Sequence, residues 1–325
     1  MSEPLILSGK DVSQSVYKSL LNRILYLKDQ NITPGLAVII VGEDPASQVY
    51  VRSKTKKFKQ LNLNTESFKL PDSTSEDELL NLIHNLNEND QFHGILVQLP
   101  LPRQIDSQRV LETIDPKKDV DGFHPENAGL LSIGRPRFVP CTPKGIMRIL
   151  SHYNIDLKGK HVVVVGRSNI VGRPISILTS LKQEGSNGTT TICHSGTPDI
   201  SQFTKSADVI IVALGVPQFL TGDMLQDGAV VIDVGINRMD ADTEKGYKLV
   251  GDAHWESISS NPNLTWDFVR DNPDNPWRWE SISVHVNITC EIIQENPDYP
   301  WNYAWVSKNP NLTIEFKYDH QKLIT

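Results

Sequence analysis

Apolar positions in the first 140 residues alternate between helical and strand-like spacing. The first segment spaces its apolar residues three or four apart, as an amphipathic helix does; they are Val12, Val16, Leu20, Ile24 and Leu27. The unbroken apolar run Leu36–Val41 predicts a buried strand, and a lysine-rich helical pattern follows at about residues 47–61. A second strand-like run lies at Gly94–Val97. Alternating strands and helices are typical of parallel sheets covered by helices.

The alternation continues after Pro143. A helical pattern through Ile146–Leu150 precedes four further apolar runs; they are His161–Val165, Thr189–Cys193, Val209–Leu214 and Val230–Val234. We therefore predict a two-lobed α/β protein with domains at residues 1–145 and 146–252.

Residues 253–325 differ from the rest and repeat every 24 residues. Trp255–Ser259 recurs as Trp279–Ser283 and, more loosely, as Tyr303–Ser307. All six tryptophans and none of the 20 glycines fall in this tail, where Asn-Pro pairs that favour turns separate short amphipathic pieces. We predict two short helices per unit, which must stack or dock on the front of the chain or on a partner.

Composition excludes several classes of function. No apolar run among the 325 residues approaches the about 18 residues of a membrane-spanning helix, so we expect a soluble protein without membrane contact. The net charge is −7, and ten acidic against five basic residues lie from residue 255 onward, which disfavours a nucleic-acid-binding face. Three widely separated cysteines and the lack of a secretory pattern at the amino terminus favour a cytoplasmic protein without disulfides or a metal site.

Tyr50 and Lys54 lie four residues apart in a predicted helix, so they can present a ring and an amine to one pocket. A lysine partly desolvated in a cleft can have its pKa lowered toward neutrality and then transfer protons. Taken alone, the pattern is more often a solvated, lysine-rich helix.

Gln98 follows the strand at Gly94–Val97 and precedes Leu-Pro-Leu-Pro, which cannot continue as a central strand. It is predicted at the carboxyl end of the strand, where open α/β sheets bind ligands, although a surface turn is the alternative. In the segment Asp119-Val-Asp121-Gly, either carboxylate could form an Asx turn, and we assign that structural role to Asp119.

In the second lobe, a strand runs into the glycine-punctuated turn Gly166–Pro174 and a predicted helix. Dinucleotide phosphates bind at such helix amino termini. Because no acidic residue ends the next strand at Cys193, while Arg167 and Ser195 can bind a ribose 2′-phosphate, we expect NADP rather than NAD. His194 is expected to be a satisfied loop histidine rather than a base.

These segments resemble the bifunctional methylenetetrahydrofolate dehydrogenase/cyclohydrolase family, called FolD in bacteria, over about residues 5–252. The resemblance rests on four motifs; they are Ser47–Lys56, Gly94–Pro102, Pro116–Gly122 and Gly166–Pro174. It implies a folate-binding catalytic lobe, a Rossmann-like NAD(P)-binding lobe and a homodimer formed through the latter. The implied reaction is oxidation of 5,10-methylenetetrahydrofolate to the methenyl form and hydrolysis to 10-formyltetrahydrofolate.

The resemblance also implies roles for individual residues. Lys54 would be the general acid/base, Gln98 would tune it, Tyr50 would pack on the folate and Asp121 would hold the pterin. Leu99 and Pro100 complete the implied substrate site. The implied cofactor residues are Thr142, Gly166, Arg167, Ser168, Ile170, Val171, Gly172, Ser195, Gly215, Gly235 and Ile236. Cys141, in the motif Pro-Cys-Thr-Pro, is expected to be a buried structural thiol.

The tail departs from the family and leaves alternatives open. After Gly251-Asp252 the family continues with a glycine-rich loop that lines the cleft, whereas this chain has no later glycine. A catalytically impaired folate- or nucleotide-binding protein, whose tail contacts a protein partner, is therefore the alternative to an active enzyme. A third reading is another nicotinamide oxidoreductase, and the tail itself resembles tandem repeats in proteins of large DNA viruses.

Overall fold

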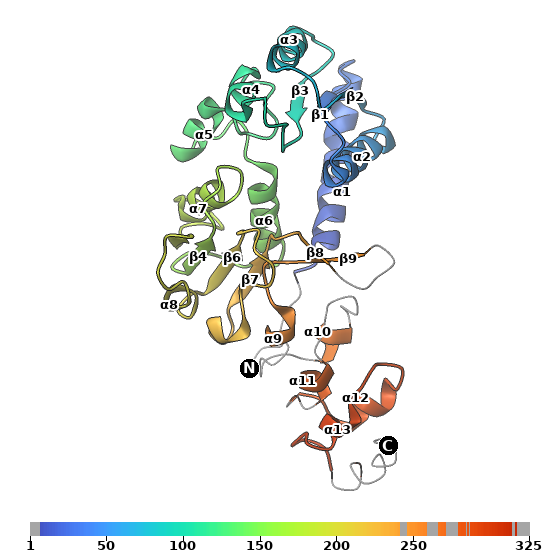
Figure 1. The fold of residues 1–325 in the computed structure, drawn as a ribbon, viewed down its shortest axis with the longest axis vertical. Coiled ribbons are helices and arrows are strands. Elements are labelled where there is room, and N and C mark those ends of the chain that lie inside the picture. The colour runs from blue at the N-terminus through green and yellow to red at the C-terminus, as the bar shows by residue number, and fades with distance from the viewer. Residues whose placement is uncertain are drawn as a thin grey trace. The chain divides into compact units, whose positions relative to one another are not determined.

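The computed structural model describes residues 7–240, 246–258, 266–270, 279–283, 285, 287–313 and 316 (Figure 1). The chain divides into two compact units. The first unit comprises Ser8–Ile155 with Asn169–Leu181, and the second comprises Asp156–Ser168 and Lys182–Thr325 with Met1–Leu7. No helix in the described ranges has the length and apolar character that crossing a bilayer requires.

A parallel three-stranded sheet is the centre of the first unit, in the order β2 (Asn64–Leu70), β1 (Gly35–Val41) and β3 (Gly94–Val97). Every residue of the central strand β1 is buried, which explains its unbroken apolar run. The sequence pattern did not indicate β2, because this edge strand alternates exposed and partly buried residues. The three strands run in one direction, so the loops that follow them emerge at one edge of the sheet.

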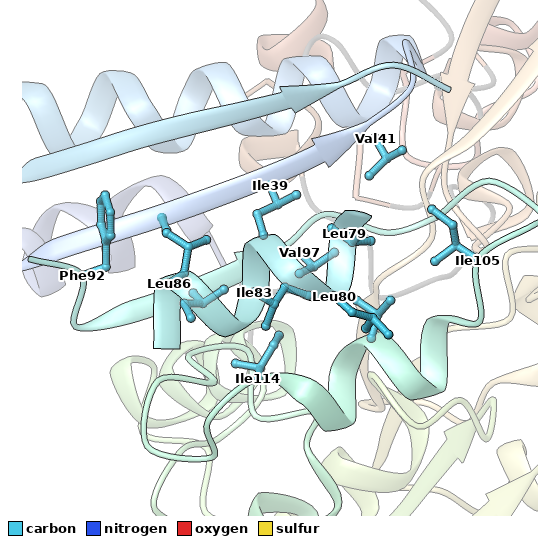
Figure 2. Close-up of a cluster of buried hydrophobic side chains, with 13 residues drawn as sticks. Ile39, Val41, Leu79, Leu80, Ile83, Leu86, Phe92, Val97, Ile105 and Ile114 are labelled. Atoms are coloured by element: carbon cyan, nitrogen blue, oxygen red, sulfur yellow. The ribbon is translucent and has the colours of Figure 1, made fainter. Parts of the chain in front are cut away.

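Two helices cover the opposite faces of this sheet. Alternate residues of β1 face α3 (Glu76–Asn87) on one side and α2 (Pro45–Gln60) on the other, as strand geometry requires. Figure 2 shows the α3 side, where Leu79 and Ile83 point toward Ile39 of β1. A capping box in which Ser75 and Glu78 satisfy each other's backbone N–H starts α3.

Further helices complete the first unit; they are α1 (Gly9–Asp29), α4 (Ser107–Thr113), α5 (Pro125–Ser132), α6 (Cys141–His152) and α7 (Gly172–Ser180). The helices predicted from the first apolar period and from the pattern after Pro143 are confirmed as α1 and α6. Helix α6 contacts α1 and α7. The first of these contacts includes the bond in which the Ser8 backbone N–H donates to the Tyr153 hydroxyl over 2.8 Å.

The second unit contains a parallel four-stranded sheet in the order β5 (Thr189–Cys193), β4 (His161–Val165), β6 (Val209–Val212) and β7 (Val230–Asp233). All four strands were predicted from apolar runs, and the α/β fold of two lobes is confirmed. The short elements α8 (Ser201–Thr204) and η1 (Gly222–Met224) follow β5 and β6. An antiparallel hairpin of β8 (Asn237–Asp240) and β9 (Tyr247–Val250) follows β7.

Short helices recur through the tail with the period of its sequence. They are α9 (Trp255–Ile258), α10 (Trp266–Arg270), α11 (Trp279–Ser283), α12 (Cys290–Glu295) and α13 (Tyr303–Val306). The helices bury a cluster of their own that includes Trp266, Ile282, Trp301 and Val306. Asn309, which is 0% exposed, donates its side-chain amide to three backbone carbonyls of residues 283–288 and so joins consecutive units. Among the described residues, the first two units each contain the two short helices expected per repeat, and the third contains α13.

The buried face of α3 makes a direct test of this architecture. Replacing Ile83, which is 0% exposed, with alanine leaves a cavity beneath the first sheet. We expect the variant to lose about 2–5 kcal/mol of unfolding free energy in urea titrations. Asn81→Ala on the exposed side of the same helix should stay within about 0.5 kcal/mol of the parent chain. Equal losses from the two variants would contradict the placement of α3.

Candidate active site

Lys54 and Gln98 meet at the carboxyl edge of the first sheet. Lys54 lies on α2, which begins where the Asp44 side chain accepts the Ser47 N–H over 2.7 Å. Gln98 follows β3 directly, and its backbone N–H donates to the carbonyl of Ile39 over 2.9 Å. The Lys54 Nζ donates to Gln98 Oε1 over 3.5 Å. The prediction that Gln98 lies at a strand's carboxyl end is therefore confirmed.

The side-chain amide of Gln98 forms a hydrogen bond with the backbone of the residue that follows it. Gln98 Nε2 donates to the carbonyl of Leu99 over 2.9 Å, which leaves Oε1 as the acceptor that faces the lysine. The Leu99–Pro100 peptide bond is cis. Tyr50 lies one turn before Lys54 on α2, but its side chain falls outside the described part of the structure.

Asp121 belongs to the same cluster. Burial raises the pKa of its carboxyl, while the nearby Lys54 cation acts in the opposite direction and Asp119 adds to the rise. The thiol of Cys141 donates to Asp121 Oδ1 over 3.7 Å. Lys54, Gln98 and Asp121 are thus brought together within one unit from three separate segments of sequence.

The expectation that Cys141 is a buried structural thiol is wrong. It is exposed rather than buried, because it is the first residue of α6 and only its Sγ atom turns toward Asp121. Desolvation of the sulfur and the adjacent Asp121 carboxylate raise the pKa of this thiol. A thiol whose pKa is raised is a poor nucleophile at neutral pH, so its exposure does not make it a catalytic group.

Asp119 has the structural role that the sequence assigned to it. It is 2% exposed, and its two oxygens accept the backbone N–H groups of Gly122 and His124 over 3.1 and 2.8 Å. The side-chain amide of Asn127 donates to it as well. Gly122 takes a φ of +71°, which a residue with a side chain rarely adopts, and the resulting turn sets the backbone direction after Asp121.

The predicted cofactor residues of the second unit follow neighbouring strands. Gly166 comes directly after β4 with a φ of +133°, and a Cβ there would overlap the carbonyl oxygen of Ala213. Arg167 and Ser195 are exposed after β4 and β5, which are adjacent in the sheet. Arg167 Nη1 lies 3.5 Å from His194 Nε2, and His194 Nδ1 accepts the Gly196 N–H over 3.0 Å. The expectation of a satisfied loop histidine is confirmed.

The remaining predicted cofactor residues divide between the units. Ser168 and Gly215 belong to the second unit, as do Gly235 and Ile236. Thr142 at the start of α6 and the segment from Ile170 to Gly172 belong to the first, where α7 begins at Gly172. An exposed guanidinium and exposed backbone in the turn after β4, with a hydroxyl after β5, form a donor set that suits a phosphorylated dinucleotide.

Two carboxylates in the second unit, the partly buried Asp233 and the buried Asp252, were not among the predicted site residues. Asp233 ends β7, and Asp252, which is 0% exposed, follows β9. Asp252 accepts the backbone N–H of Gly215, and Asp233 accepts the backbone N–H of Gly235. The position of Asp233 at a strand's carboxyl end was a usable signal, whereas nothing in the spacing connected it to Asp252.

Comparison with known families decides the relationship. Residues 7–121 match the model of the tetrahydrofolate dehydrogenase/cyclohydrolase catalytic domain, and residues 140–265 match that of the tetrahydrofolate dehydrogenase/cyclohydrolase NAD(P)-binding domain. The chain belongs to the tetrahydrofolate dehydrogenase/cyclohydrolase family. The second match extends past residue 252, so the family relationship reaches slightly further than the sequence motifs indicated.

Individual family members agree with this placement. The bifunctional protein FolD of Chlorobium chlorochromatii is 52% identical over 79% of this chain and 88% of its own length. The crystal structure of FolD from Campylobacter jejuni superposes with a TM-score of 0.73 at 44% identity, covering 78% of this chain and 87% of that one. The Trypanosoma brucei enzyme, solved with NADP cofactor and inhibitor, gives 0.74 at 35% identity, covering 79% and 88%.

The raised pKa of Asp121 predicts a pH-dependent effect on stability. Because the folded chain holds a proton on this carboxyl more readily than the unfolded chain does, the charged form opposes folding above the raised pKa. Asp121→Asn, which is neutral throughout, should therefore raise the melting temperature at pH 7–8, and its advantage should shrink as the pH falls toward 4. Asp119→Asn is the matched control and should lower the melting temperature at pH 7, because its donors lose a charged acceptor. A lower melting temperature for Asp121→Asn at pH 7–8 would contradict this electrostatic account.

Proposed function

We infer that this chain oxidises 5,10-methylenetetrahydrofolate to 5,10-methenyltetrahydrofolate and hydrolyses the product to 10-formyltetrahydrofolate. The observation that carries this function is the contact of Lys54 Nζ with Gln98 Oε1 beside the Asp121 carboxyl. The comparisons support it, since relatives about half identical to this chain are named bifunctional FolD proteins.

The hydrolytic step needs one group that moves protons. Water that adds to the methenyl carbon must lose a proton, and the ring nitrogen must gain one as the ring opens. An amine next to the substrate can do both, and we assign this work to Lys54. The side-chain oxygen of Gln98 accepts a hydrogen bond from the Lys54 amine and so holds the amine in one orientation. The other positions of the amine nitrogen remain for proton exchange with the substrate.

Asp121 is assigned to substrate binding. A pterin edge presents N–H donors, and a half-buried carboxylate with spare acceptor positions suits them. Tyr50, together with Leu99 and Pro100, would pack on the flat ring. Their positions support this assignment, because Tyr50 shares α2 with Lys54 and the other two follow Gln98 in sequence.

The second unit is assigned to the dinucleotide, which accepts a hydride from the folate when it is bound. We propose NADP as the preferred form, on the exposed Arg167 guanidinium and the Ser195 hydroxyl after neighbouring strands. Gly166, Ser168 and Gly215 would admit the cofactor close to the backbone. By the family resemblance, Thr142, Ile170, Val171 and Gly172 are proposed as further cofactor residues, and so are Gly235 and Ile236 in the loop after β7.

The organisation of the whole chain is proposed on the same basis. Residues 1–145 would form the folate-binding domain, residues 146–252 the NAD(P)-binding domain and residues 253–325 the repeat tail. A cytoplasmic homodimer formed through the NAD(P)-binding domain follows the family pattern. A protein partner for the tail is supported by its excess of acidic residues and by Trp305, which is 38% exposed, whereas Trp266 and Trp301 of the same tail are buried.

Replacing Lys54 separates the two activities. Lys54→Met should lower the rate of methenyltetrahydrofolate hydrolysis by about 10²- to 10⁴-fold, because the proton-transferring amine is lost while the shape of the helix is kept. Lys56→Met, two residues along on the exposed side of α2, is the matched control and should keep the parent rate. The loss of absorbance of the methenyl compound measures both. A parent-like rate for Lys54→Met would refute the assigned mechanism.

Replacing Arg167 tests the choice of cofactor. Arg167→Ala should raise the KM for NADP by about tenfold or more, because a charge-assisted bond to the 2′-phosphate is lost, and should leave the KM for NAD nearly unchanged. Arg148→Ala, at an exposed arginine of α6 outside the proposed cofactor residues, controls for general loss of positive charge. Equal changes in the KM for the two dinucleotides would show that Arg167 does not read the phosphate.

A further inference from the structure

Asp252 holds two loops at the carboxyl edge of the second sheet. Its Oδ2 accepts the backbone N–H groups of Leu214 and Gly215, in the loop after β6, over 2.6 and 3.0 Å. Its Oδ1 accepts the side-chain amide of Asn237, at the start of β8, over 2.8 Å. One carboxylate therefore connects the loop after β6 with the strand that follows the loop after β7.

Asp233 extends this connection. Its Oδ1 accepts the N–H groups of Gly235 and of Asp252 itself, each over 2.9 Å, and its Oδ2 accepts the Ala253 N–H over 3.0 Å. Burial raises the pKa of the Asp233 carboxyl, with a further contribution from the charge of Asp252, while the three N–H donors oppose the rise. The two carboxylates and their donors thus form one network.

Two glycines make this arrangement sterically possible. A Cβ at Gly251 would overlap the Oδ2 atom of Asp233, and a Cβ at Gly235 would overlap the Oδ1 atom of Asp252. Each carboxylate consequently lies against a bare backbone, where it can accept N–H groups without displacing a side chain. The loop after β7 and the segment after β9 could not approach so closely with any other residue at these positions.

We propose that Asp252 is a positioning residue for the dinucleotide, acting through the loops that carry Gly215 and Gly235. This inference rests on the proposed function, in which those two glycines contact the cofactor. Gly215 has a φ of +67°, and no described residue lies within 4 Å of where its Cβ would be, so its backbone is open at that position. The Asp252 carboxylate holds the backbone N–H groups of Leu214 and Gly215 and so fixes the course of this loop.

The negative charge and both oxygens of Asp252 are needed for this role. An amide in the same place keeps one acceptor oxygen but turns an NH₂ group toward N–H donors, which repel it. Asp252→Asn would therefore release either the pair of N–H groups after β6 or the amide of Asn237. The loops would remain in place only part of the time, and the dinucleotide would have to order them on binding.

The test compares the dinucleotide and folate activities of full-length variants. Asp252→Asn should raise the KM for the oxidised dinucleotide by about tenfold or more, and likewise the Kd for the reduced dinucleotide, which is measured by its nicotinamide fluorescence. The hydrolysis of methenyltetrahydrofolate needs no dinucleotide and reports whether the rest of the chain is folded. Asp208→Asn is the matched control, because Asp208 accepts the His161 N–H over 2.8 Å at the opposite edge of the same sheet. It should leave the dinucleotide KM and Kd unchanged.

A second variant covers the case in which Asp252→Asn does not fold. Asn237→Ala removes only the amide that joins β8 to Asp252 and should give a smaller rise, of about two- to fivefold, in the same KM and Kd. Unchanged values in the folded variants, or an equal rise in Asp208→Asn, would overturn the inference. A parent chain that hydrolyses methenyltetrahydrofolate but binds neither NADP nor NAD would overturn the proposed cofactor function as well, whereas a parent that binds them with unaltered variants would overturn the positioning role alone.

Discussion

The parallel direction of the strands is the constraint on which the functional chemistry depends. In a parallel sheet every strand ends at the same edge, so the residues that follow separate strands become neighbours. In the first unit this brings Gln98, after β3, to the lysine of α2. In the second unit it gathers the turn after β4 with the loops after β6 and β7. Neither cluster could be assembled from adjacent residues of one segment.

Carboxylates lie at the carboxyl edges of both sheets, but their surroundings differ. Asp119 and Asp252 are almost fully buried, and each accepts two backbone N–H groups and one asparagine side-chain amide, so they shape loops. Asp121 instead carries a thiol contact and a charge that its surroundings disfavour, which leaves it able to gain from a ligand. A buried carboxylate whose oxygens are all hydrogen-bonded within the protein stabilises geometry, whereas one that is poorly satisfied is suited to binding. This distinction supports the proposal that Asp121 binds the substrate.

The sequence predicted the strands that are buried on both faces and the residues that directly follow them. Apolar runs and strand ends are local signals, and they located β1, Gln98 and the turn at Gly166. It missed the edge strand β2, whose polar residues dilute the pattern, and it misjudged Cys141, because its exposure depends on the start of α6. The link of Asp252 to Gly215 was also beyond local signals, since it joins residues 37 positions apart through one side-chain oxygen. Long-range contacts of single atoms leave no period in a sequence.

The repeat tail buries a hydrophobic cluster of its own and lies outside the segments that carry Lys54, Gln98 and Asp121. We expect the chain, tail included, to be a working bifunctional enzyme. This is tested by the absorbance of methenyltetrahydrofolate formed from 5,10-methylenetetrahydrofolate and NADP by the purified full-length chain, followed until the absorbance decays. The absorbance should rise and then decay at a rate that depends on the enzyme. A folded chain that binds folate but produces neither phase would contradict this expectation.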